Sequence, residues 1–95
     1  MREVEIYIPA HLKTLEFAIN SFAVFFGGVT AYHAGGLWVD ENNLPVEEKV
    51  VIVRGITDMK FKSIIKVIET IVEKMKEEGE ESVLYTTKTL DAHFV

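Results

Sequence analysis

The chain contains no cysteine, few basic residues and no long apolar run. Without cysteine it can form neither disulfides nor thiolate metal sites, which suits a reducing compartment. No apolar run approaches the roughly 20 residues of a membrane span, and the charged residues Arg2, Glu3 and Glu5 occupy the place of a signal-peptide core. These absences predict a cytoplasmic protein without a membrane partner.

Basic residues are outnumbered, with 10 Lys and Arg against 15 Asp and Glu and a net charge of −5. A nucleic-acid-binding domain needs a basic surface to exchange against phosphate counterions, so no nucleic-acid partner is expected. Glutamine is absent while Glu and Lys are abundant, a usage typical of thermophile proteins. A length of 95 residues with 48% hydrophobic content predicts a single domain that spans residues 1–95.

In the first part of the chain, apolar and polar residues alternate, and after Pro9 the apolar residues recur at the spacing of a helix. Residues Glu3 to Ile8 place apolar side chains on every second position, the pattern of a half-buried strand that Pro9 ends. From Ala10 or His11 the spacing predicts a helix, ended by Gly27-Gly28, whose apolar arc comprises Leu12, Leu15, Ala18, Ile19, Phe22 and Phe26.

A hairpin is predicted after this helix. Two runs rich in β-branched and aromatic residues flank Asp40 to Asn43, where Asp and Asn favour a turn. Pro45 lacks a backbone N–H, so the second strand is placed at Val46 to Arg54. Gly35-Gly36 in the first strand predicts a bulge or bend rather than a phosphate-binding loop.

The second helix carries the clearest pattern in the chain. Thr57 or Asp58 is the expected N-cap and Gly79 the expected stop. Its predicted buried stripe comprises Phe61, Ile64, Ile65, Ile68, Ile71, Val72 and Met75. A strand is expected at Ser82 to Lys88, and Leu90 to Val95 is either a short fifth strand or an extended arm.

The order strand, helix, strand, strand, helix, strand predicts a fold of the α+β class. Right-handed crossovers and one hairpin give the ferredoxin-like βαββαβ sandwich, with an antiparallel sheet and both helices on one face.

Three segments carry a family resemblance: Phe26-Gly27-Gly28-Val29-Thr30, Gly36-Leu37-Trp38-Val39-Asp40, and Glu47-Glu48 before the run Val50 to Val53. Together they resemble a family of short uncharacterised prokaryotic proteins, and the resemblance implies a ferredoxin-like fold without an activity. The element order is more broadly similar to that of PII and CutA proteins, which implies a trimeric, effector-binding alternative.

Candidate ligand-binding residues are few. Lys60, Lys62 and Lys66 cluster in the first half of the second helix, where an anion would relieve the repulsion between them. Pairing with nearby carboxylates is the alternative. Trp38 could line a cleft. His33, His93 and Asp91 would form a metal site only if the fold brought them together, so no metal, cofactor or catalytic residue is expected.

The acidic pairs are interpreted as surface charge. Glu47 and Glu48 should point to opposite faces of a strand, and the acids around Gly79 should form a solvated helix end.

Apolar residues outside the expected core predict a subunit contact. The unbroken run Val50 to Val53 must place apolar side chains on both faces of the sheet. The candidate interface residues are Tyr7, Phe17, Val24, whichever of Val51 and Ile52 points away from the helices, and Phe94. A homo-oligomer is therefore expected, with a dimer favoured by symmetry and a trimer as the alternative.

No single activity follows from these features. The sequence favours a small non-catalytic oligomeric interaction module, with a protein that binds a small molecule or anion as the alternative and an enzyme as the third possibility.

Overall fold

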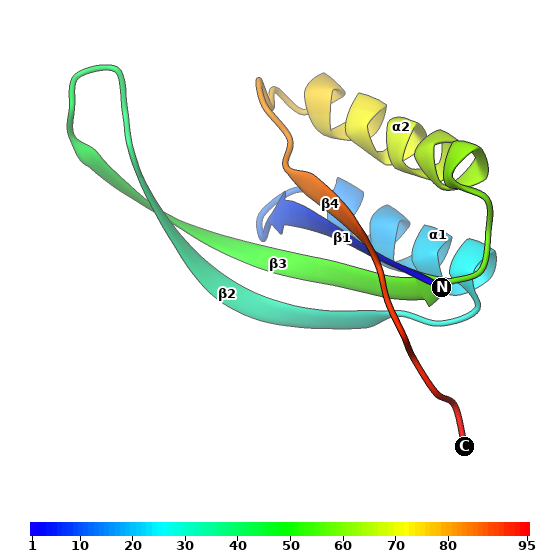
Figure 1. The fold of residues 1–95 in the computed structure, drawn as a ribbon. Coiled ribbons are helices and arrows are strands. Elements are labelled where there is room, and N and C mark those ends of the chain that lie inside the picture. The colour runs from blue at the N-terminus through cyan, green and yellow to red at the C-terminus, as the bar shows by residue number, and fades with distance from the viewer.

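A computed structural model describes all residues, 1–95, and confirms the ferredoxin-like α+β fold. In chain order the elements are β1 (Arg2–Pro9), α1 (Thr14–Phe26), β2 (Thr30–Val39), β3 (Pro45–Thr57), α2 (Phe61–Glu77) and β4 (Tyr85–Thr89). The four strands form one antiparallel sheet in the order β2-β3-β1-β4, and both helices cover the same face (Figure 1). Neither helix combines the length and apolar character needed to cross a membrane.

The core lies between that face and the helices. Alternation in β1 sends Val4, Ile6 and Ile8 toward the helices, where all three are fully buried. Val51 and Val53 stand opposite Ile8 and Ile6 in the ladder and therefore face the same way. Val51 is thus a core residue, and the alternative that it points away from the helices is wrong.

Glycine at position 55 lets α1 approach the sheet. Phe22 and Phe26 form an edge-to-face pair with ring centroids 4.8 Å apart. A Cβ on Gly55 would lie 2.8 Å from Cδ2 of Phe26 and 3.1 Å from Cδ2 of Phe22. The two rings therefore occupy the space that a side chain at position 55 would need. Gly27 ends α1 in the left-handed conformation, as predicted.

Helix α2 differs from its prediction at its start and in its stripe. Its N-cap is Lys60 rather than Thr57 or Asp58, because the Thr57 hydroxyl accepts a bond from the Met59 amide within the preceding turn. Phe61 is exposed and Ile65 is only half-buried, whereas Val67 is buried. The helix packs on α1, and its buried residues, Val67 among them, join the same core cluster as the apolar residues of the sheet.

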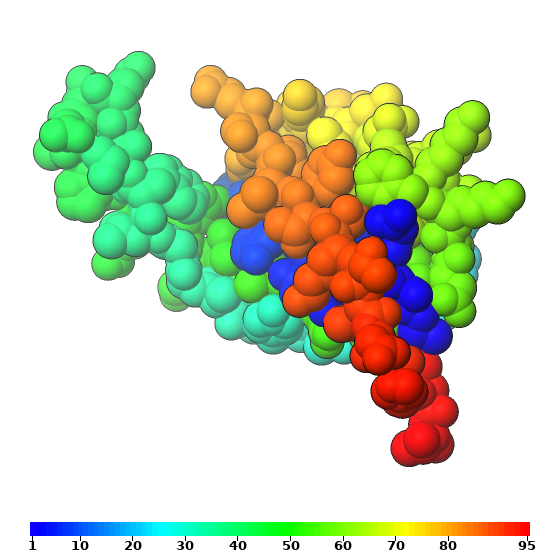
Figure 2. Space-filling model, viewed as in Figure 1, coloured from blue at the N-terminus to red at the C-terminus, as the bar shows by residue number.

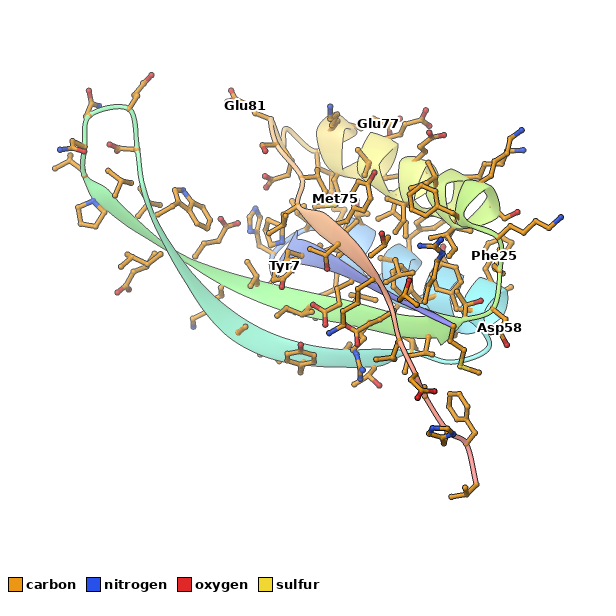
Figure 3. All side chains as sticks on the ribbon, in the orientation of Figure 1. Tyr7, Phe25, Asp58, Met75, Glu77 and Glu81 are labelled. Atoms are coloured by element: carbon orange, nitrogen blue, oxygen red, sulfur yellow. The ribbon has the colours of Figure 1, made fainter.

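The end of α2 follows the prediction. Gly79 has a φ of 99°, the Gly79 amide donates to the Lys76 carbonyl, and the Glu80 amide donates to that of Met75. This is a Schellman stop. Figure 3 shows Met75 on the side of the last turn that faces the sheet and Glu77 on the opposite side.

The β2–β3 hairpin extends well beyond the sheet. β3 pairs with β2 from Pro45 to Arg54 but with β1 only from Val50 onward. Apart from the Lys49 carbonyl, which accepts a bond from the Ala10 amide, residues 35–49 therefore form a two-stranded ribbon that extends beyond β1, called the arm below (Figure 1). The predicted strand start at Val46 is wrong by one residue: Pro45 pairs with Val39, because the last pair of a ribbon can do without the missing N–H.

The turn at the tip of the arm forms as predicted. Asp40 Oδ1 accepts bonds from the amides of Asn42 and Leu44, and Asn43 takes a positive φ of 63°.

The last strand is shorter than predicted. β4 begins at Tyr85 rather than Ser82: its ladder with β1 starts at the Ile6–Tyr85 pair, and beyond it only the Tyr7 amide donates, to the Leu84 carbonyl. The possible fifth strand at Leu90 to Val95 does not form, and this segment leaves the sheet as an extended tail (Figure 1).

Candidate functional site

A groove of about 740 Å³ lies at the base of the arm. Figure 2 shows the hollow between the arm and the segment that leads into β4. Fifteen residues line it: Tyr7, Pro9, Ala34, Gly35, Gly36, Leu37, Trp38, Glu48, Val50, Ile52, Gly79, Glu80, Glu81, Ser82 and Leu84. We call this the arm groove.

The floor of the arm groove is the helix-free face of the sheet. Tyr7 stands opposite Ile52 and Pro9 opposite Val50 in the β1–β3 ladder, so all four side chains lie on one face, away from the core. The same register continues into the arm. Ile52 is only 8% exposed although no helix covers it, because the neighbouring strands carry tyrosines beside it.

One wall of the groove carries the single tryptophan. Trp38 and Gly36 share a face of β2, and a Cβ on Gly36 would lie 3.2 Å from Cζ3 of Trp38. The indole therefore lies over the glycine, which leaves room for it. Trp38 remains 46% exposed, so its ring is available to another molecule. Trp38 lines the groove, and ligand binding by Trp38 stays a prediction.

The charged groups that line the groove are all carboxylates. Glu48 comes from the arm, whereas Glu80 and Glu81 come from the opposite wall. Burial raises the pKa of Glu48, the negative charge of Glu80 raises it further, and His11 opposes both. Because Glu48 and Glu80 line the same groove, together with Glu81, negative charge gathers there without a lysine or arginine.

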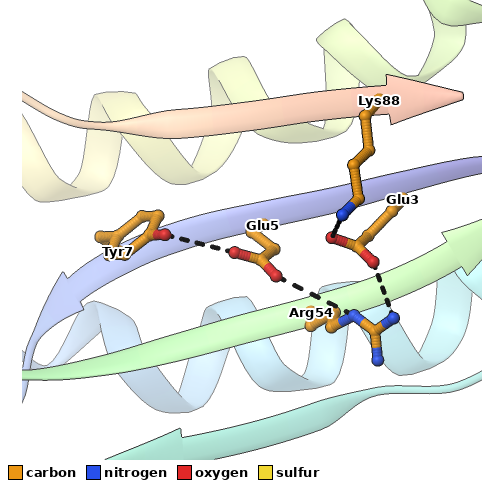
Figure 4. A network of polar contacts seen from close by, with 5 residues as sticks. All are labelled: Glu3, Glu5, Tyr7, Arg54 and Lys88. Carbon is orange, nitrogen blue, oxygen red and sulfur yellow. Dashed lines mark hydrogen bonds and ion pairs between the residues drawn. The ribbon is translucent and has the colours of Figure 1, made fainter. Parts of the chain in front are cut away.

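A second group of charges lies on the same face of the sheet, away from the groove (Figure 4). Arg54 Nη2 donates to Glu3 Oε2 at 2.7 Å, and Arg54 Nε lies 3.9 Å from Glu5 Oε1. Lys88 Nζ lies 3.4 Å from Glu3 Oε1. These acids therefore have Arg54 or Lys88 beside them, whereas no lysine or arginine lines the groove.

The contacts within this network shift the pKa values of its members. Burial alone would raise the pKa of Glu3, but the bond and charge of Arg54, with the charge of Lys88, hold it below its usual value. The Tyr7 hydroxyl donates to Glu5 Oε2 at 3.3 Å, and burial followed by the charge of Glu5 raises the pKa of Tyr7. Tyr7 thus connects the charged network to the groove floor.

The three candidate lysines lie elsewhere. Lys60, Lys62 and Lys66 are exposed on the first half of α2, and none lines the arm groove. None forms an ion pair with a carboxylate either. Anion binding at these lysines stays a prediction.

The candidate interface residues are dispersed. Tyr7 and Ile52 lie on the groove floor, whereas Phe17 packs at the edge of the core with Lys74 Nζ 4.6 Å from its ring centroid. Val24 and Phe94 are largely exposed, at 76% and 74%.

The histidines do not converge. His93 lies 3.4 Å from Asp91 in the exposed tail, and no group of three or more His, Cys, Asp or Glu side chains could hold a metal ion.

The acids of the groove were missed by sequence reasoning. Glu47 and Glu48 do alternate as predicted, since Glu48 stands opposite Gly36 and Glu47 opposite Leu37. The acids around Gly79 are exposed as predicted at Glu77, Glu78 and Glu81, but Glu78 also bonds to the start of α1, and Glu80 is half-buried and lines the groove. No local signal marks either role, because the partners lie far away in the chain.

Proteins of similar fold are found among the solved structures, but no comparison identifies a family. No protein-family model and no curated protein matches the chain. A phage SAM lyase in complex with S-methyl-5′-thioadenosine is similar, with a TM-score of 0.65 and 11% identity over 92% of this chain and 79% of that one. A phage SAM lyase in its apo state gives 0.65 and 12%, over 92% and 78% of the two chains.

A Bacillus cereus protein related to NIF3 is also similar, with a TM-score of 0.61 and 18% identity. The match covers 96% of this chain but only 25% of that protein, so the chain spans about a quarter of its length. At these identities the likeness concerns the fold alone.

Proposed function

We propose that the protein is a non-catalytic homo-oligomeric binding module in which the arm of one copy packs against a neighbouring copy. The observation that carries this proposal is the exposure of apolar side chains on the arm. Val39 and Leu44 are each 59% exposed, and Leu37 is 66% exposed. Nothing in the chain covers this part of the arm.

The physical reason is that a two-stranded ribbon is only marginally stable in water by itself. The arm has lost both the pairing with β1 and the cover of the helices that stabilise the rest of the hairpin. Packing against a second copy would bury its apolar side chains, and exposed apolar patches commonly mark such contacts. A dimer is favoured by symmetry, and a trimer would use the same arm.

The groove also lacks the pair of side chains that catalysis by a serine nucleophile would need. Ser82, the only serine or threonine in the arm groove, makes no hydrogen bond to a histidine or carboxylate. A serine nucleophile needs such a base beside it.

The test of assembly replaces two apolar residues at the arm tip. Val39→Lys combined with Leu44→Lys should dissociate the oligomer while circular dichroism stays unchanged, since neither residue belongs to the core. Val24→Lys is the control, because Val24 is an exposed apolar residue, 76% exposed, that lies on α1 and not on the arm. Sedimentation velocity at micromolar concentration gives the measurement. A monomeric wild type overturns the proposal. If Val24→Lys dissociates the oligomer and the double variant does not, the subunit contact lies on α1 and not on the arm.

Small-molecule binding in the arm groove is a second candidate function. The groove volume of about 740 Å³ lies within the range of roughly 300–1,000 Å³ for ligand pockets, and an aromatic ring stands in its wall. A phage SAM lyase with a similar fold has been solved in complex with S-methyl-5′-thioadenosine, which supports a small molecule with a planar ring as a first probe. Titration with that nucleoside should change the fluorescence of Trp38. Trp38→Phe, studied by calorimetry, checks that the indole contributes to the affinity.

A further inference from the structure

The arm groove combines an aromatic wall with carboxylates on two sides. The exposed indole of Trp38 lies against Gly36 on the arm, and the Tyr7 ring belongs to the floor. Aromatic rings of this kind stack on planar groups and attract cations to their faces. Glu48 on the arm and Glu80 on the opposite wall leave a ligand between two negative charges.

These carboxylates differ from the other buried or bonded acids of the chain. Glu3 has Arg54 and Lys88 beside it, and Glu78 accepts backbone amides at the start of α1. Neither the Glu48 nor the Glu80 carboxylate takes part in an ion pair or a side-chain hydrogen bond, and no lysine or arginine lines the groove. A positively charged group placed between them would satisfy both.

We propose that the arm groove binds an organic cation that carries a planar ring. The ring lies against Trp38 and the cationic group lies between Glu48 and Glu80. This inference rests on the second candidate function, small-molecule binding in the arm groove.

Two other ligand classes fit the groove less well. A phosphate or carboxylate ligand would meet three acids and no lysine or arginine. A bare metal ion would need three or four converging ligands, and no such group exists. Burial is the main cause of the raised pKa of Glu48, and the negative charge of Glu80 raises it further. A positively charged ligand would relieve the repulsion from Glu80, which favours an organic cation over an anion.

The test uses a planar ring with three different charges. 5′-Amino-5′-deoxyadenosine carries a cation, adenosine is neutral and adenosine monophosphate is an anion. Each is titrated while the fluorescence of the single tryptophan is followed. The cation should bind about threefold to tenfold more tightly than adenosine, the advantage expected for partly exposed charge pairs, and the monophosphate should bind most weakly. Raised salt should reduce the difference.

Variants connect the preference to the named residues. Glu48→Gln and Glu80→Gln should each remove most of the preference for the cation while the affinity for adenosine stays within twofold. Glu69→Gln is the matched control, because Glu69 is exposed on α2 and its loss changes the net charge by the same amount. Circular dichroism verifies that each variant is folded.

The outcomes separate the two proposals. Equal binding of the cation and adenosine overturns the inference about charge and leaves small-molecule binding intact. Tighter binding of the monophosphate overturns it as well. A second series, phenethylamine, phenethyl alcohol and phenylacetate, extends the test to another ring. If neither cation binds at millimolar concentration, both the inference and the groove as a ligand site are overturned.

Discussion

The Glu78 carboxylate bonds to the Thr14 residue at the start of α1, 64 positions earlier in the chain. Its Oε2 accepts from the Thr14 amide and hydroxyl, and its Oε1 accepts from the Lys13 amide at 2.8 Å. Lys13, the N-cap of α1, provides no side-chain cap. A residue from the end of one helix therefore satisfies the free amides at the start of the other.

Glu78→Gln should lower the melting temperature at neutral pH. The bonds from Thr14, followed by that from Lys13, lower the pKa of Glu78. A carboxyl group whose pKa is lowered by folding stabilises the fold above its unfolded pKa, near 4.3, and this contribution is lost as the pH falls through the folded pKa. The difference between variant and wild type should therefore disappear in acid. Thermal melts from pH 7 to pH 3 measure it, with Glu77→Gln as the control.

Gly55→Ala should destabilise the fold by about 1–3 kcal/mol, the usual cost of overpacking. The new Cβ would lie 2.8 Å from the ring of Phe26, so that ring must move away from the sheet. Gly28→Ala is the control, because its Cβ would meet no atom within 4 Å and its φ is not positive. Urea denaturation compares the two. Equal midpoints for both variants would mean that α1 does not sit so close to β3.

Arg54→Met should cost about 2–3 kcal/mol at neutral pH, because Glu3 loses its 2.7 Å partner while its side chain is only 7% exposed. Lys88→Met should cost less than about 1 kcal/mol, since Lys88 is 64% exposed and its attraction is screened by water.

The Arg54 effect should also depend on pH. Arg54 lowers the pKa of Glu3, so the stabilisation is present above the unfolded pKa near 4.3 and is lost as the pH falls through the folded value. Denaturation at pH 7 and at pH 3 tests this, and an effect of equal size at both values would argue against a charge interaction.

Glu48→Gln should stabilise the fold at neutral pH. Burial and the charge of Glu80 raise the pKa of Glu48 while His11 lowers it, so ionisation of Glu48 opposes folding. That cost is absent below the unfolded pKa and appears as the pH rises toward and above the folded pKa. The melting temperature of the variant should exceed that of wild type at pH 7 and equal it near pH 3.5. Glu47→Gln, on the opposite face of the arm, should show no such crossover.

The local patterns of the sequence determined the elements and their order. Alternation predicted β1, the glycine at 79 predicted the end of α2, and Asn43 predicted the turn, because each depends on the conformational preferences of neighbouring residues. The fold class followed from the order of these elements, since handedness and short connections leave few arrangements.

The tertiary structure decided which faces and which distant residues meet. The run Val50 to Val53 is apolar on both faces of the strand, so the sequence does not decide which of its residues face the core. The pairing with β1 placed Val51 in the core and Ile52 on the groove floor. The length of β1 also decided where the sheet ends and the arm begins. Glu48 and Glu80 lie more than thirty residues apart in the sequence, so their place in one groove depends on the packing of the whole chain, because periodicity reports only on near neighbours.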